Sequence, residues 1–112
     1  MSDVTVAAIH SALNGLALRQ RVIADNIANI NTPGYHAKKV EFESALASAV
    51  AFGDGGAQAD VRTSLEPTRE DGNNVNLDHE TLTNVDTGLR YQLMLRAMDG
   101  KFGLLRDALR NG

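Results

Sequence analysis

The sequence contains no cysteine and no tryptophan. Without cysteine the chain can form no disulfide bond, no thiolate metal site and no cysteine nucleophile. The aromatic residues are only three Phe and two Tyr, and most of the apolar content is Ala, Leu, Val and Ile. That composition is more typical of helix–helix packing than of a ligand pocket.

The sequence also lacks a dominant charge and a long hydrophobic run. Its net charge is −3 with both signs mixed along 112 residues, so no basic patch predicts nucleic acid or anionic lipid as a partner. No apolar run approaches the length needed to cross a membrane. The first residues have neither a basic leader nor the apolar stretch of a secretory signal, so we expect no cleaved signal peptide. The length predicts one small domain.

Residues typical of catalysis are missing or isolated. His10, His36 and His79 are far apart, and none has a second ligand at a metal-binding spacing, so surface positions are expected. Glu41 and Glu43 are more simply explained as side chains on a solvent-exposed face than as a general acid and base. No glycine-rich phosphate loop or nucleophile elbow is present. We therefore predict no enzyme, no cofactor, no metal site and no small-molecule substrate.

An apolar repeat runs from about residue 4 to residue 30. Its members recur at alternating steps of four and three, which is the heptad spacing of a helix that packs against another helix. We call them the first seam: Ile9, Leu13, Leu16, Ile23, Ile27 and Ile30. A helix of this length spans roughly 40 Å, more than so small a domain covers by itself. Gly15 weakens it, which favours packing against partners over an ordinary amphipathic core helix.

A second repeat of the same spacing closes the chain. We call it the second seam: Tyr91, Leu95, Met98, Phe102, Leu105 and Leu109. Leu82, Val85 and Leu89 extend this helix on an adjacent stripe, as expected if it touches several neighbours. Asn76 or Asp78 can cap its start.

The segment between the two repeats is irregular. Pro33 ends the first helix, because proline lacks an N–H group and restricts the residue before it. Residues 42–50 have helical spacing, although the alternation of residues 40–43 could begin a strand; we favour a short helix. Residues 53–60 are glycine-rich and predict a flexible loop. Residues 61–72 are expected to be extended or irregular.

These elements predict a mainly α fold. The long terminal helices pair as a coiled-coil-like inner domain, and the middle segment faces outward. The expected parts are residues 1–35, with the N-terminal helix and turn, residues 36–75, and residues 76–112, whose helix forms one unit with the first part.

The most specific string in the chain runs from Asp25 to Tyr35, with the sequence DNIANINTPGY. It closely resembles the N-terminal signature of the flagellar rod and hook proteins, in which an amphipathic helix leads into an asparagine-rich turn and pairs with a C-terminal helix. Asparagine can bond backbone groups at a helix end, and Pro-Gly enforces a turn. The motif residues carried by the resemblance are Asn26, Ala28, Asn29, Thr32, Pro33, Gly34 and Tyr35.

Within that family, the short length and the stretches 72–80, 89–92 and 100–102 look like the proximal rod proteins. His36 departs from the basic residue usual there, and Asn76 from a common acidic one. The resemblance implies a structural subunit that polymerises through its terminal helices and transmits torque in the rod that crosses the periplasm. Implied partners are copies of itself, other rod proteins, a FliE-type adaptor, the MS ring and the flagellar type III export apparatus.

One alternative comes from another class of protein. A pair of amphipathic helices also suits a cytosolic helical-hairpin adaptor or chaperone that forms a closed dimer. Symmetry separates the two, because an interface between two different surfaces can propagate, whereas an interface between identical surfaces stops at two copies.

Overall fold

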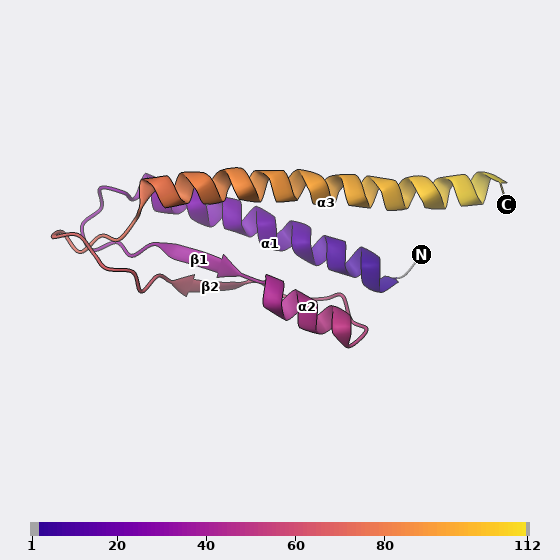
Figure 1. The fold of residues 1–112 in the computed structure, drawn as a ribbon, viewed down its shortest axis with the longest axis horizontal. Coiled ribbons are helices and arrows are strands. Elements are labelled where there is room, and N and C mark those ends of the chain that lie inside the picture. Colours follow the sequence, from indigo (N-terminus) through magenta and orange to yellow (C-terminus); the bar gives the residue numbers. More distant parts are fainter. Residues whose placement is uncertain (1–2, 112) are drawn as a thin grey trace.

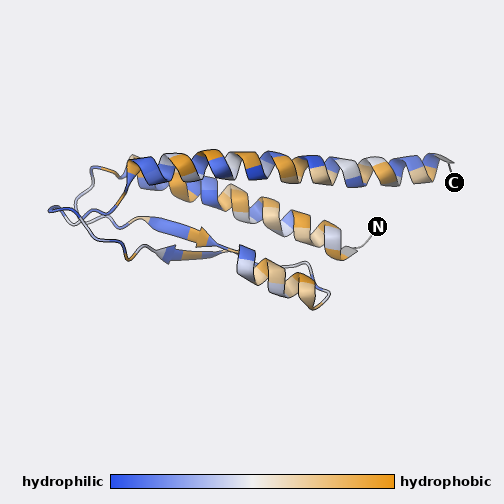
Figure 2. Ribbon diagram, in the orientation of Figure 1, coloured by the Kyte–Doolittle hydropathy of each residue, from blue (hydrophilic) through white to orange (hydrophobic). Residues whose placement is uncertain are grey.

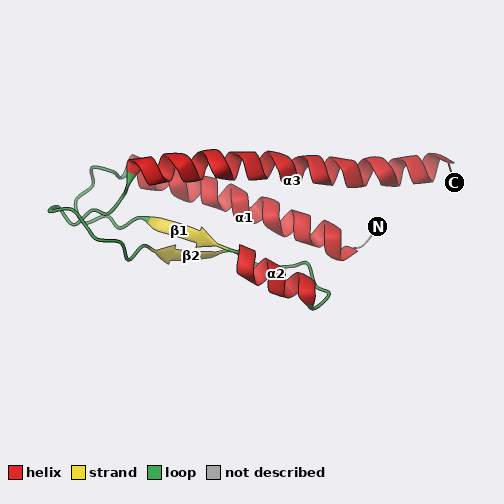
Figure 3. Cartoon of the chain, viewed as in Figure 1, coloured by secondary structure: helices red, strands yellow, loops and turns green. Residues whose placement is uncertain are grey.

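The computed structural model describes residues 3–111 as an elongated, mainly helical molecule of 65 × 26 × 14 Å. Figure 3 shows the element order, which is α1 (Asp3–Ala28), β1 (Lys38–Glu41), α2 (Glu43–Ala51), β2 (Asp60–Thr63) and α3 (Leu77–Asn111). The two terminal helices lie antiparallel, and α3 continues past the start of α1 (Figure 1). The predicted fold class, with paired terminal helices around an irregular middle, is confirmed.

The two long helices pair because each has an apolar face at helical spacing. Leu16 of α1 is 2% exposed, and Tyr91 and Met94 of α3 pack against the core cluster that contains it. Gln20 of α1 lies beside Gly88 of α3, because a Cβ added at Gly88 would lie 3.8 Å from the Gln20 Nε2 atom. This contact marks which turns of the two helices face each other.

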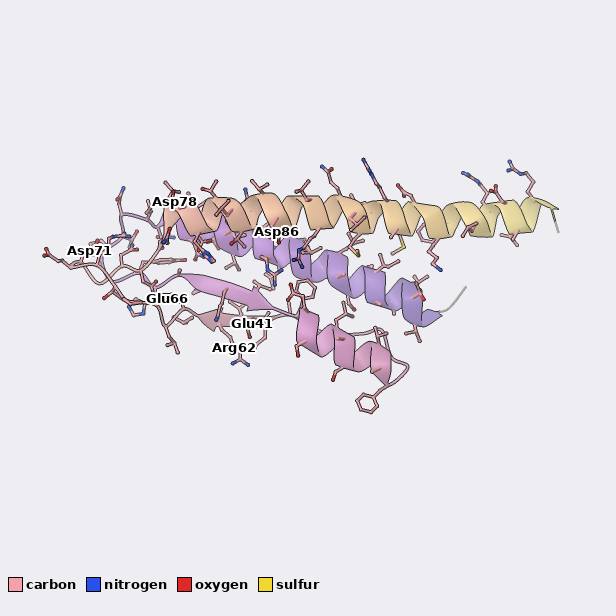
Figure 4. The ribbon with its side chains drawn as sticks, in the orientation of Figure 1. Glu41, Arg62, Glu66, Asp71, Asp78 and Asp86 are labelled. Atoms are coloured by element: carbon pink, nitrogen blue, oxygen red, sulfur yellow. The ribbon has the colours of Figure 1, made fainter. Side chains whose placement is uncertain are left out.

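The middle segment begins with a two-stranded hairpin that the sequence did not predict as such. β1 and β2 pair antiparallel, with Val40 opposite Val61. Val40 is buried, whereas every residue of β2 is exposed. Glu41 and Arg62 lie on the side away from the helices and form an ion pair of 3.4 Å (Figure 4). With one inward residue in four on β1 and none on β2, the alternation is too short to identify strands from sequence alone.

The short helix expected over residues 42–50 is confirmed as α2. The preceding Phe42 is buried against α1, where a Cβ at Gly15 would lie 2.5 Å from its Cδ1 atom. The Arg19 guanidinium carbon lies over this ring, 4.9 Å from its centroid, and Arg19 forms an ion pair with Glu43 at 2.5 Å. Gly15 is thus the site that admits the Phe42 ring into the core.

The loop after α2 is held against α1. Ser11 donates to the Gly55 carbonyl at 2.9 Å and accepts from the Ala57 N–H at 3.1 Å. A Cβ at Gly55 would lie 2.3 Å from the Val4 carbonyl oxygen. The expected flexible loop is therefore a docked one, because its glycine permits backbone contact that sequence periodicity cannot reveal.

Hydrophilic and hydrophobic residues alternate along the whole of α3 (Figure 2). Within residues 3–111, none of the helices combines the length and the apolar content needed to cross a membrane.

Candidate functional site

Two turns that are far apart in sequence meet at the end of the molecule opposite both termini (Figure 1). We call this region, residues 26–38 together with 64–80, the corner. The Gly34 N–H donates to the Asp71 carbonyl at 2.8 Å. Gly34 and Gly72 have φ of 74° and 82°, and their backbones almost touch, since a Cβ at Gly72 would lie 3.3 Å from the Gly34 Cα. Both positions require glycine for conformation, and Gly72 also for space.

Asn26 joins α1, the hairpin and α3. Its side chain is fully buried, and its amide nitrogen donates to the Lys38 carbonyl at 2.7 Å and to Glu80 Oε1 at 3.1 Å. Its oxygen accepts from the Lys38 N–H at 3.0 Å and the Tyr35 hydroxyl at 3.1 Å. All four hydrogen-bonding positions of the amide are used, so only asparagine fits this site fully.

Asn73 plays the same role for the turn after α1. It is fully buried and donates to the carbonyls of Asn29 and Thr32, each at 2.9 Å. Its oxygen accepts from the Val75 N–H at 2.7 Å. Thr32 in turn bonds the Asn29 side chain at 3.0 Å. The two asparagine-rich stretches therefore satisfy each other's backbone groups.

Asn74 and Arg69 complete the corner. Asn74 accepts from the Ala37 N–H at 2.6 Å, which ties the chain leading into β1 to the chain leading into α3. Arg69 donates to the carbonyls of Val75 and Ile30, each at 2.7 Å. A guanidinium that bridges two carbonyls from different turns fixes their separation.

The start of α3 is set by Asn76 and not by Asp78. The Asn76 side-chain oxygen accepts from the His79 N–H at 3.1 Å, and its carbonyl accepts from the Glu80 N–H at 2.9 Å. This is the geometry of a helix N-cap, which the sequence had left open between two residues.

Glu80 carries a buried carboxyl group at the junction of α1 and α3. Burial raises the pKa of Glu80 above its usual value, although the Asn26 hydrogen bond and nearby His79 act in the opposite direction. Burial also raises the pKa of Tyr35, helped by the charges of Asp25 and Glu80. The junction therefore favours neutral forms of both side chains.

The structure brings most of the motif residues together. Asn26, Asn29, Thr32, Gly34 and Tyr35 all bond within the corner. The two other motif residues, Ala28 and Pro33, are exposed.

Sequence reasoning missed the other half of the corner, namely Arg69, Asn73, Asn74 and Glu80. The available signal was the string GNNVN at residues 72–76, whose amides can bond backbone groups, although nothing in the spacing connects it to residues 26–35.

The seam residues divide between buried and exposed positions. In the first seam, Ile9, Leu16 and Ile23 are buried and the remaining three are partly buried. In the second seam, Tyr91 and Met98 are partly buried, but three members are exposed: Leu95, Phe102 and Leu109. The side chain of Leu105 lies outside the described residues.

An open groove of about 960 Å³ runs beside the corner, between β1 and the start of α3. Many of its polar lining groups already bond within the corner, including Arg69, Asn74, Asn76 and Glu80. Among the described residues, no group of three or more acidic or histidine side chains could hold a metal ion. Every buried side-chain nitrogen and oxygen of the described residues has a hydrogen-bond partner. The polar groups of the corner thus serve the fold.

A pair of long helices closed at one end by a satisfied polar corner, with apolar side chains left exposed along one helix, defines a structural subunit. The comparisons with known proteins agree. The family model described as flagella basal body rod protein matches residues 9–36. Over 122 aligned positions, the chain is 32% identical to the flagellar basal body rod protein FlgB of Bacillus subtilis, covering 96% of this chain and 95% of the relative.

Two further relatives carry the same name. FlgB of Escherichia coli is 33% identical over 98% of this chain and 96% of its own length, and FlgB of Borrelia hermsii is 33% identical over 81% and 84%. The chain therefore belongs to the flagellar basal body rod protein family. It is a structural rod subunit of the basal body that associates with other rod proteins, and the adaptor or chaperone alternative is not supported.

Proposed function

We propose that this chain builds the proximal part of the rod by polymerising through its terminal helices, and that it transmits torque without chemical turnover. The observation that carries the proposal is the antiparallel pair of α1 and α3, in which α3 keeps large apolar side chains in water. Such faces are stabilised by burial against neighbours.

The corner suits a mechanical role. The reversal of the chain between the two helices is held by part-buried hydrogen bonds that Asn26, Asn73 and Arg69 donate to backbone carbonyls. Breaking such bonds in a buried site costs free energy for each unpaired group. The corner therefore keeps the two helices at a fixed angle under load.

We propose a division of labour along the seams. The buried members, such as Leu16 and Ile23, hold α1 to α3 within one subunit. The exposed members of the second seam, Leu95, Phe102 and Leu109, contact neighbouring subunits, together with Leu82, Val85 and Leu89 of the adjacent stripe.

The finer partners are also proposals and rest on family membership. They are a FliE-type adaptor and the MS ring at the base of the rod, and the flagellar type III apparatus as the export route to a rod that spans the periplasm. Residues 1–35 and 76–112 would form the inner part of the rod, with residues 36–75 outside it.

The decisive experiment replaces the chromosomal gene with a tagged copy. We expect the tagged protein to co-purify with basal bodies, and deletion of the gene to abolish motility and hooks. A protein that spreads through the cytoplasm and leaves basal bodies intact when deleted would contradict the proposal.

A further inference from the structure

The described part of the chain leaves a row of large apolar side chains on α3 exposed. Leu82, Val85, Leu89 and Leu93 are each between 59% and 71% exposed. Their spacing of three, four and four residues places them on one helix face. That face points away from α1, because α1 is met by Thr87, Tyr91 and Met94 on the opposite side. We call this row the outer stripe.

The face of α1 that is turned away from the core has mostly small or polar side chains, in contrast to the large apolar side chains of the outer stripe. Residues at alternating steps of four and three along this face have small or polar side chains and are exposed or partly exposed: His10, Asn14, Ala17, Arg21, Ala24 and Ala28. Neither α3 nor the hairpin covers it. We call this row the small face.

We propose that the outer stripe of α3 in one copy packs on the small face of α1 in the next copy, with the two helices antiparallel. This inference rests on the proposed function and names the surfaces by which copies of this chain meet. Leucine side chains projecting from one helix fill the spaces that alanine leaves on another, as in other close helix packings.

The register within the chain supports the pairing. Inside one copy, Asn26 lies beside Glu80 and Gln20 beside Gly88. If the same antiparallel register is repeated between copies, Ala24 meets Leu82 of the next copy, and Asn14 meets Leu93. Alternating α1 and α3 helices would then form a continuous layer.

Charge also matches in this register. Arg21 is exposed, and among the described residues it has no ion pair or side-chain hydrogen bond. The repeated register places it opposite Asp86, an exposed carboxylate that forms an ion pair with Arg90 at 2.9 Å. The contact joins two different surfaces, so each added copy leaves one of each free, and assembly continues as a ring or a helix instead of stopping at two copies.

Cysteine cross-linking tests the pairing directly, because the native chain has no cysteine. Two strains each co-express a pair of single variants: Ala24→Cys with Leu82→Cys, and Asn14→Cys with Leu93→Cys. Each variant is first checked for motility when it is expressed alone. Basal bodies are then purified from the strains and oxidised. A disulfide needs Cα atoms about 4.4–6.8 Å apart, so it reports close helix contact. The double variant Lys39→Cys/Arg62→Cys, at directly opposed positions of the β1–β2 hairpin, should close within one chain and controls for oxidation.

The expected result is a cross-linked dimer from each mixed pair and none from any variant expressed alone. A dimer from Leu82→Cys or Leu93→Cys alone would overturn the inference, because it would mean that the outer stripe pairs with itself. Basal bodies that contain the variants and form the control disulfide, but give no mixed dimer, would also overturn it while leaving the proposed function intact. Absence of the native protein from basal bodies would refute the proposed function itself, and the inference with it.

Discussion

At the scale of single residues, the buried amides of the corner are the most sensitive positions. Asn26 satisfies groups from β1, the turn and α3 at once, and its four bonds link residues up to 54 positions apart. A side chain of the same size without the amide would leave several of these groups unpaired, and buried unpaired groups are costly.

We expect Asn26→Ala to lower the free energy of unfolding by about 3 kcal/mol, because it orphans the Lys38 backbone and one oxygen of Glu80. Chemical denaturation of the purified chain measures this. Asn14→Ala, which removes an exposed amide from the same helix, is the matched control and should change stability by less than about 0.5 kcal/mol. Equal effects from the two substitutions would argue against the corner as a stability centre.

Glu80 makes the stability of the chain depend on pH. Burial raises the pKa of Glu80 above its ordinary value of 4.5, so the folded state binds this proton more tightly than the unfolded state. Its stabilising contribution is fully present below pH 4.5 and is lost as the pH rises through the folded-state pKa. Glu80→Gln should therefore be neutral or stabilising at pH 7, and should remove that part of the pH dependence.

Glu43 serves as a control for Glu80, because its pKa is shifted in the opposite direction. Burial alone would raise its pKa, but hydrogen bonds from Arg19 and from the backbone, with the Arg19 charge, outweigh burial and lower it. Its contribution is present above pH 4.5 and is lost as the pH falls through the lowered pKa. Denaturation curves of Glu43→Gln should thus lose stability at pH 7, whereas those of Glu80→Gln should not. A fall in stability at pH 7 for both variants would contradict the assignment for Glu80.

At the scale of elements, glycine is needed for packing at one position of the long helices and is not needed at another. Gly15 in α1 admits the ring of Phe42, whereas a Cβ at Gly100 in α3 would meet nothing within 4 Å. The same substitution should therefore act with opposite sign in the two helices.

We expect Gly15→Ala to destabilise the chain by about 1–3 kcal/mol, since the Phe42 ring must leave its place. Gly100→Ala should instead stabilise it by up to about 1 kcal/mol, because alanine is the better helix former and has room. Thermal melts followed by circular dichroism measure both. Stabilisation by Gly15→Ala would mean that Phe42 does not pack on α1 as described.

At the scale of the whole molecule, the unequal lengths of the two helices matter. α3 has 35 residues and α1 has 26, so the last part of α3 projects beyond its partner (Figure 1). Phe102, in the C-terminal part of α3, is 53% exposed. An apolar side chain in this position gains burial when another subunit covers it.

Phe102→Asp should leave the soluble chain folded, because the side chain is already half in water. In an assembled rod the same carboxylate would be buried without a partner, at a cost of several kcal/mol in every copy. We expect non-motile cells that still make the protein. Phe52→Asp, at the exposed end of α2, is the matched control and should retain motility. Motility assays and electron microscopy of basal bodies distinguish the two, and intact rods built from Phe102→Asp subunits would exclude this contact.

Substitution of Ile23 is a different experiment. Ile23 is 4% exposed within the single chain, so Ile23→Asp should unfold the subunit before assembly can be tested. Two residues from the same kind of heptad repeat thus report on different interfaces, and only their burial distinguishes them.

Apart from the end of α1, which lies at Ala28 and not at Pro33, the sequence by itself determined the two long helices, their approximate extents and the short helix α2. These features depend on spacings of three and four residues and on local backbone restrictions, which neighbouring residues encode. The tertiary structure alone decided that Asn26 would bond Glu80, that Gly15 would hold the Phe42 ring, and which seam residues would be buried within one chain. Each of these depends on contacts between distant segments, whose geometry exists only once α1, the hairpin and α3 have packed together.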